Sequence, residues 1–227
     1  MKFAPAVAVF VVLAGITAFA QNPQLEEKLA ALKQNQAANK QKLAQYTWQE
    51  TETISIKGNV KGTKVYQVQM VNGQQQKTEV SNQQAQQGGR QGRVKEHVVE
   101  KKKEEYQEYG QQISALAKQY TTPDPDRLMQ AKQAGNISLQ PGAGTVALII
   151  KDYVKRGDSV TLTIEPQSKQ LQNIRVASYL SDAKDAVTIS AEFARLPDGT
   201  NHVASTLING VTKQLTVNDV NSNYQMR

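Results

Sequence analysis

The chain has 227 residues and no cysteine, and its 27 Lys and Arg residues outnumber its 20 Asp and Glu residues. The absence of cysteine excludes disulfide bonds, thiolate metal sites and a lipid-modified N-terminal cysteine. The excess positive charge favours anionic partners, such as lipid head groups, envelope polymers or acidic proteins. Nucleic acid is disfavoured, because the basic residues are not interleaved with aromatic side chains that could stack on bases.

Residues 1–20 have the features of a signal peptide. Lys2 supplies a positive charge, residues 3–18 are uncharged and mostly apolar, and small residues flank Phe19 before a cleavage site after Ala20. An uncleaved anchor is the alternative, because the apolar run is near the lower length limit for a spanning helix. We expect cleavage, a single mature domain over 21–227 and a periplasmic location, although the glycosylation sequon at Asn136 also permits a eukaryotic exterior.

The mature chain is expected to begin with a helix over 23–46 and three strands within 50–80. Leu25, Leu29 and Leu32 recur at helical spacing, and acidic residues occupy the first turn of this segment. Apolar alternation and the Asn72-Gly73 pair then indicate strands joined by tight turns. Between them lies Trp48, which we expect to anchor the helix on the sheet, with ligand stacking as the alternative.

The middle of the chain combines a loop with helices. Residues 81–93 are rich in Gln and Gly without apolar periodicity, which predicts a flexible loop. Over 94–134 an apolar stripe that ends near Tyr120 predicts a long helix, and Asp124-Pro125 predicts the start of a short one. The candidate contacts with an anionic surface are Lys101, Lys102 and Lys103, for which an ordinary solvated helix face is the alternative.

Residues 136–220 are expected to form a closing meander of short strands. Apolar residues alternate with polar ones, and turn sequences such as Asn209-Gly210 separate the runs. One expected strand places Val203, Ser205 and Leu207 on a single face. The connections are too short for parallel crossovers, so neighbouring strands should be antiparallel and about six to eight residues long.

These elements predict an α+β fold. We expect a strongly curved antiparallel sheet of about nine or ten strands, an incomplete barrel covered on one face by the N-terminal helix and the mid-chain helical insertion.

No pattern in the sequence indicates catalysis. His97 and His202 are not in a metal-ligand spacing, and no nucleophile motif is present. The carboxylates, including Asp219, are interpreted mostly as strand-end and turn residues. We therefore expect no catalytic residue, metal or cofactor. A hydrolase remains an alternative, and it would require a cleft that contains a strongly perturbed pair of acids.

The order of elements resembles that of the periplasmic outer-membrane lipoprotein carrier superfamily. The similarity lies in the N-terminal helix, the strands that start after Tyr46-Thr47-Trp48, the helical insertion, and the closing meander with Leu196-Pro197-Asp198-Gly199-Thr200. It implies a curved half-barrel whose apolar concavity, beneath helices, holds acyl chains. No residue of this chain aligns with the functional arginine or the lid residues of that family.

The first hypothesis is therefore a periplasmic, monomeric binder of lipid or of acylated protein. Its candidate apolar lining is Trp48, Tyr109, Ile113, Leu148, Ile150, Leu162, Ile164, Ile189 and Phe193. The same residues could instead close into a dry core. The alternative function is an interaction or sensor module that docks an envelope protein or an anionic membrane surface through its basic helix, without a lipid ligand.

Overall fold

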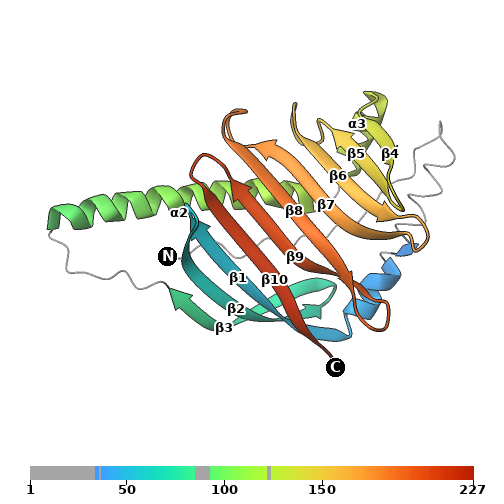
Figure 1. The fold of residues 1–227 in the computed structure, drawn as a ribbon, viewed down its shortest axis with the longest axis horizontal. Helices are drawn as coiled ribbons and strands as arrows, with labels where there is room; N and C mark the ends of the chain where they lie inside the picture. The colour runs from blue at the N-terminus through green and yellow to red at the C-terminus, as the bar shows by residue number, and fades with distance from the viewer. Residues whose placement is uncertain (1–33, 36, 85–92, 122–123) are drawn as a thin grey trace.

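The computed structural model describes residues 34–35, 37–84, 93–121 and 124–227 (Figure 1). The expected signal peptide, the first part of the expected N-terminal helix and the centre of the Gln-rich loop lie outside these residues. In the described part, no helix combines the length and the apolar character needed to cross a membrane.

A short helical segment at 37–43 precedes the strands and the two longer helices of the described chain. The elements are β1 (Tyr46–Ile56), β2 (Asn59–Val71), β3 (Gln74–Gln84), α2 (Arg93–Thr121), α3 (Pro125–Gln133), β4 (Ile137–Pro141), β5 (Val146–Lys151), β6 (Ser159–Glu165), β7 (Gln170–Tyr179), β8 (Ala186–Arg195), β9 (Asn201–Gly210) and β10 (Leu215–Met226).

These strands form one 10-stranded antiparallel sheet in the order β3-β2-β1-β10-β9-β8-β7-β6-β5-β4. The sheet is curved and open, with β3 and β4 at its two edges (Figure 1). Neighbours in the sheet are consecutive in the chain, except where β1 pairs with β10 and joins the first hairpins to the closing meander. The expected α+β class with a curved antiparallel sheet is confirmed.

One face of the sheet, here called the interior face, carries the main apolar core. The C-terminal half of α2 packs on this face through Tyr109, Ile113 and Leu116, each at most 5% exposed. These side chains belong to one cluster with apolar residues from β1 and from β5 to β10. Figure 1 shows α2 running across the ends of these strands, with its N-terminal half extending past the sheet.

Hydrogen bonds and an ion pair attach α2 to three turns at one end of the sheet, here called the α2 end. Lys213, in the β9–β10 turn, lies 3.2 Å from the carboxylate of Glu105. The Tyr109 hydroxyl donates to Asp185, in the β7–β8 turn, at 2.8 Å. The Tyr120 hydroxyl donates to Asp158, in the β5–β6 turn, at 2.6 Å. The helix is therefore attached to the sheet from Glu105 to Tyr120.

The turn that precedes β6 is itself organised by Asp158, which is 2% exposed. Its carboxylate accepts hydrogen bonds from the backbone N–H groups of Tyr153, Val154 and Lys155 at 2.6, 2.9 and 3.0 Å. Because a buried carboxylate needs several donors, these three N–H groups and the Tyr120 hydroxyl together offset its loss of hydration.

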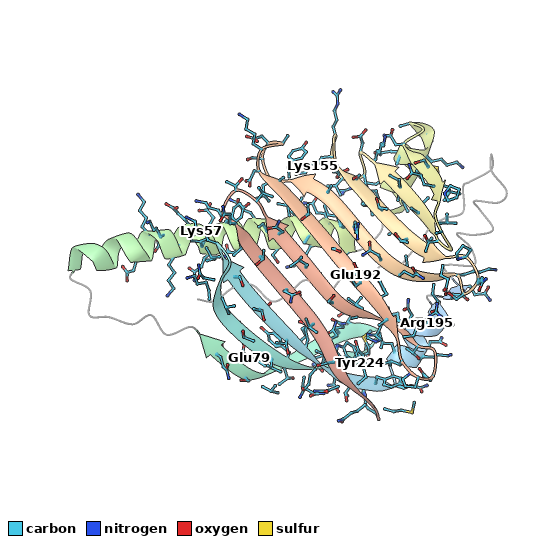
Figure 2. All side chains as sticks on the ribbon, viewed as in Figure 1. Lys57, Glu79, Lys155, Glu192, Arg195 and Tyr224 are labelled. Carbon is cyan, nitrogen blue, oxygen red and sulfur yellow. The ribbon has the colours of Figure 1, made fainter. Side chains whose placement is uncertain are left out.

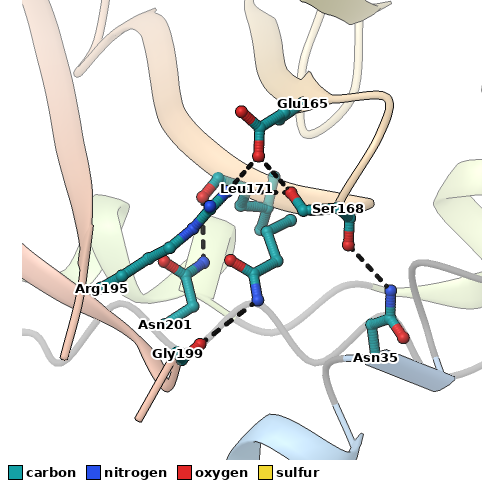
Figure 3. Close-up of polar contacts among 8 residues, drawn as sticks. Asn35, Glu165, Ser168, Leu171, Arg195, Gly199 and Asn201 are labelled. Atoms are coloured by element: carbon teal, nitrogen blue, oxygen red, sulfur yellow. Dashed lines mark hydrogen bonds and ion pairs between the residues drawn. The ribbon is translucent and has the colours of Figure 1, made fainter. Parts of the chain in front are cut away.

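The opposite end of the sheet is attached to the N-terminal helical segment. The Asn39 side chain pairs with the backbone of Asn201, accepting from its N–H at 2.6 Å and donating to its carbonyl oxygen at 2.5 Å. Asn35 donates to the carbonyl oxygen of Ser168 at 3.2 Å (Figure 3). In the same network Arg195 forms an ion pair with Glu165. The segment thus bridges the β6–β7 turn and the start of β9.

Several expected boundaries are wrong. The first helix does not reach residue 46, since β1 already begins at Tyr46 and contains Trp48. Residues 81–84 belong to β3 rather than to a loop, and β10 continues to Met226. Strands β1 to β3 and β7 to β10 have 10 to 13 residues, which is longer than expected. In each case pairing with a neighbouring strand extends the β conformation through polar sequence that carries little local signal.

The face expected for β9 is also wrong, because the strand contains a β-bulge. Phe193 pairs with Val203, whereas Glu192 pairs with Ser205, so one extra residue lies on β9. Such an insertion reverses the facing of all residues beyond it. Val203 therefore packs against the core, while Leu207 is 45% exposed.

Gly210 permits the close approach of α2 to the sheet. A β-carbon at this position would overlap Ile113 and would lie 2.7 Å from Cε1 and 2.8 Å from the hydroxyl oxygen of Tyr109. Both neighbours are buried, so they have little room to move. We expect Gly210→Ala to lower the free energy of unfolding by about 1–3 kcal/mol, the usual cost of overpacking a core. Chemical denaturation measures this change.

Gly62→Ala is the matched control for this substitution. Gly62 also lies in a strand, but its added β-carbon would meet only the carbonyl oxygen of Gln83, at 3.6 Å. We expect this control to be neutral or slightly stabilising, because alanine restricts the unfolded chain more than glycine does. Equal stability of Gly210→Ala and the unmodified protein would contradict the proposed packing.

Candidate functional site

Eight of the nine candidate lining residues lie together on or against the main core. They come from α2 (Tyr109 and Ile113) and from β5, β6 and β8, and every one of these eight belongs to the main cluster or packs against it. Six are buried, whereas Ile164 and Phe193 are only partly buried. The expectation that α2 and the meander share one apolar face therefore matches their positions.

Trp48 lies in a second, smaller apolar cluster with Leu43, Val68 and Met70. It is 1% exposed and stacks on Tyr224 with ring centroids 5.5 Å apart. Its indole N–H donates to the Asn221 side chain at 3.0 Å. Figure 2 labels Tyr224 near the end of β10, where this cluster lies. These contacts attach β1 to β10, and the contact with Leu43 attaches the N-terminal helical segment to the sheet.

Three of the partly buried apolar residues lie at the end of the sheet opposite the turns that α2 contacts. Ile164 lies near the end of β6, Phe193 near the end of β8, and Val203 near the start of β9, and all three are of intermediate exposure. Phe193 and Val203 are direct cross-strand partners. The α2 contacts described above are all with the other end. Partly buried apolar side chains such as Val217 also lie at the α2 end, and Leu171 at the opposite end is buried.

A cluster of buried carboxyl groups, here called the acidic cluster, separates the two apolar clusters along β1. It comprises Glu50, Glu52 and Asp219, which are 4%, 2% and 4% exposed. Alternation along β1 places Glu50 and Glu52 on the same face as Trp48 on one side and Ile54 on the other. Glu52 lies directly opposite Asp219 of β10.

Two lysines from the neighbouring hairpin flank the acidic cluster. The Lys77 ammonium contacts both carboxylate oxygens of Glu50, at 2.5 and 2.7 Å. Lys64, which pairs across the strands with Glu52, is 3.5 Å from Glu79. Figure 2 shows Glu79 on β3, at the open edge of the sheet.

Burial disfavours the charged forms of Glu52 and Asp219. Burial raises the pKa of the Glu52 carboxyl group, with Lys64 acting in the opposite direction and Glu50 adding to the rise. Burial also raises the pKa of Asp219 well above its usual range, and the negative charges of Glu50 and Glu52 add to this effect. One oxygen of Glu52 and one of Asp219 are buried without a hydrogen-bond partner.

Chemically, such a pair can hold protons or bind a cation. Within the described residues, no group of three or more His, Cys, Asp or Glu side chains is placed to hold a metal ion. The geometry is therefore better suited to a proton or a cationic group.

The sequence analysis missed Glu50 and Glu52 and misplaced Asp219. Asp219 lies within β10 rather than at a turn or strand end, so that interpretation is wrong. A signal for the glutamates was present, because Glu50 and Glu52 continue the alternation of Ile54 and Ile56. It was obscured because the strand was expected to begin too late.

The three candidate surface lysines are all exposed. They are Lys101, Lys102 and Lys103 of α2, and they lie N-terminal to Glu105. Glu105 is the first residue of α2 in the contacts with the sheet described above. The adjacent positions 104 and 105 are exposed glutamates.

The raised pKa values predict a pH dependence of stability. Between the usual pKa of a carboxyl group, about 4, and the raised pKa, the folded chain keeps protons that the unfolded chain releases. The stabilisation is present at low pH and is lost as the pH rises through the folded-state values. A carboxyl pKa that is one pH unit higher in the folded than in the unfolded chain changes the free energy of unfolding by about 1.4 kcal/mol. We therefore expect Glu52→Gln/Asp219→Asn to have a higher Tm than the unmodified protein at pH 8, and a similar Tm at pH 4.

Glu192→Gln removes one negative charge from the other face of the sheet and is the control for these melting curves. Glu192 is exposed and hydrogen-bonded to Asn173. Its substitution should leave the difference between pH 4 and pH 8 unchanged. If the double variant keeps the pH dependence of the unmodified protein, the acidic cluster does not hold its protons in the way inferred here.

Comparison with known proteins assigns no function to this site. No protein-family model matches the chain, and no curated protein matches it in sequence. The resemblance to lipoprotein carriers therefore stays a prediction based on the order of elements, and function has to be argued from the described residues.

Proposed function

We propose that this protein is an exported, non-enzymatic binding protein that holds acyl chains of a lipid or of an acylated protein against the interior face of its sheet. The observation that carries the proposal is the apolar interior face of the sheet. On this face Ile164, Phe193 and Val203, at the end opposite α2, are only partly buried. An acyl chain laid along this end would remove their remaining apolar surface from water.

The energetics of such binding need no catalytic group. Burying one methylene group contributes about 0.8 kcal/mol, so a long acyl chain contributes on the order of 10 kcal/mol before the cost of ordering it. The N-terminal helical segment reaches the same end of the sheet through Asn35 and Asn39. We propose that this segment covers the bound chain, beside the part of the face covered by α2, with the protein acting as a monomer in the periplasm.

Native mass spectrometry of mature protein, purified gently from a periplasmic extract and then extracted with solvent, tests this function. We expect phospholipid or acylated peptide to accompany the protein, and an acyl ligand added to stripped protein to be taken up. Phe193→Gln should reduce uptake several-fold, because it places an amide among the apolar side chains that would contact the chain.

Leu207→Gln is the matched control for the uptake experiment. Leu207 faces away from the core and is 45% exposed, so the same chemical change there should leave acyl uptake intact. A stripped, folded protein that takes up no acyl ligand would rule out the carrier function.

A second function, docking to an anionic membrane or envelope surface, is favoured by the three exposed lysines of α2. Figure 1 shows that the N-terminal half of this helix extends beyond the sheet, where it is available to a partner. Each lysine near an anionic membrane contributes about 1 kcal/mol at moderate salt. Replacing Lys101, Lys102 and Lys103 by glutamine should therefore weaken binding to anionic vesicles strongly, and added salt should narrow the difference.

A triple variant with the same charge change provides the control for vesicle binding. Lys57, Lys61 and Lys151 are exposed and lie at or near turns of the sheet. Replacing them by glutamine should weaken vesicle binding much less. If the two triple variants lose binding equally, net charge rather than the α2 lysines determines the interaction.

A further inference from the structure

Two buried oxygens of the acidic cluster lack a partner within the described chain. Oε1 of Glu52 and Oδ1 of Asp219 are fully covered but accept no hydrogen bond, and their side chains are 2% and 4% exposed. The two residues lie directly opposite each other on β1 and β10. Because buried polar groups are nearly always satisfied in folded proteins, this pair of oxygens points to a missing donor.

The nearby lysines have other partners. Lys77 is engaged by both oxygens of Glu50 at 2.5 and 2.7 Å, and Lys64 lies 3.5 Å from Glu79. If both members of the pair are ionised, the acidic cluster with Glu79 carries four negative charges and its two lysines carry two positive charges. The missing donor is therefore expected to be a cation.

The contact of Lys77 with Glu50 indicates which cation the site suits. A primary ammonium group already fits between the carboxylate oxygens there, close to Glu52 and Asp219 along the same strands. An ammonium group has three donors, which is enough for both unpartnered oxygens. The described residues offer no metal-binding group of three or more such ligands, so an ammonium group is favoured over a metal ion.

The surroundings of the pair indicate what the ammonium group belongs to. Two residues along their strands, Ile54 belongs to the main apolar cluster and Val217 packs against it. Across the strands, toward the β3 edge of the sheet, exposure increases from Lys64, whose side chain is 15% exposed, to Glu79, at 41%. A ligand at this site would thus have apolar side chains along the strands and the exposed edge of the sheet across them.

We propose that Glu52 and Asp219 bind the primary ammonium group of an amphiphile, so that the protein selects acyl ligands with an amine in the head group, such as an aminophospholipid. This inference rests on the acyl-binding function proposed above and adds the class of ligand. The apolar chain lies on the interior face of the sheet, and the ammonium group lies between β1 and β10.

Protons compete with the ammonium group for this site. Burial and like charges raise the pKa of both carboxyl groups, so at acidic pH they hold protons. The groups that face them are Glu50 on β1, Lys64 and Tyr66 on β2, and Lys77 and Glu79 on β3. Since binding requires at least one ionised carboxylate, affinity for the amine rises with pH through the raised pKa values.

The test is a native mass spectrometry titration with three phospholipids of identical acyl chains. Phosphatidylethanolamine presents an ammonium group with N–H donors, phosphatidylcholine a cation without them, and phosphatidylglycerol no cation. At pH 8 we expect the unmodified protein to prefer phosphatidylethanolamine over both others by roughly tenfold, the effect of a charge-assisted hydrogen bond. At pH 5 the preference should shrink. Glu52→Gln/Asp219→Asn should lose the preference but keep its uptake of phosphatidylglycerol, whereas Glu192→Gln should keep both.

Each outcome separates this inference from the function on which it rests. Failure of the unmodified protein to take up any of the three lipids overturns the acyl-binding function. Equal uptake of the three lipids by the unmodified protein overturns only the amine selectivity. It would indicate that Glu52 and Asp219 hold a proton instead of an ammonium group. Because the lipid comparison uses the unmodified protein, it stays decisive even if the double variant fails to fold, in which case Glu52→Gln alone replaces it.

Discussion

The antiparallel pairing of β1 with β10 joins the two parts of the sheet. The hairpins β1 to β3 and the meander β4 to β10 are each built from neighbouring strands, and in the strand order of the described chain this pairing makes them one sheet. It brings together segments far apart in sequence, as the contact between Trp48 and Asn221 shows, at a separation of 173 residues. Closing so long a loop costs entropy, and the buried ring pair Trp48–Tyr224 and the apolar residues at the other end of β1 offset this cost.

The pairing of β1 with β10 also brings together acidic groups that destabilise it. Glu52 and Asp219 lie across from each other at its centre, and ionising both in a buried setting would place like charges together. A sheet built only for stability would place apolar residues there, as β1 does at Ile54 and Ile56. Buried acidic residues that destabilise the pairing of two strands are the kind of exception that proteins retain at functional sites. Proton and amine binding would each relieve this destabilisation.

Helix α2 is attached to one end of the sheet. Its tyrosines and Glu105 reach three turns at one end of the sheet, and the missing side chain of Gly210 allows close packing there. The N-terminal segment, attached through Asn39, lies at the opposite end. The two helical elements thus divide the length of the sheet, which is the arrangement that the proposed carrier function uses.

The sequence by itself determined the features that have a local signal. These are the alternation of the strands, the turns between them and the apolar stripe of α2, and together they give the α+β class. They also identify eight lining residues, out of nine expected, that lie in or against one cluster. Only the tertiary structure decided the partner of β1, the bulge that turns Val203 inward and Leu207 outward, and the meeting of Glu52 with Asp219. Periodicity is a property of neighbouring residues, whereas pairing and register depend on contacts between distant strands, and a single inserted residue reverses a face without changing the local pattern.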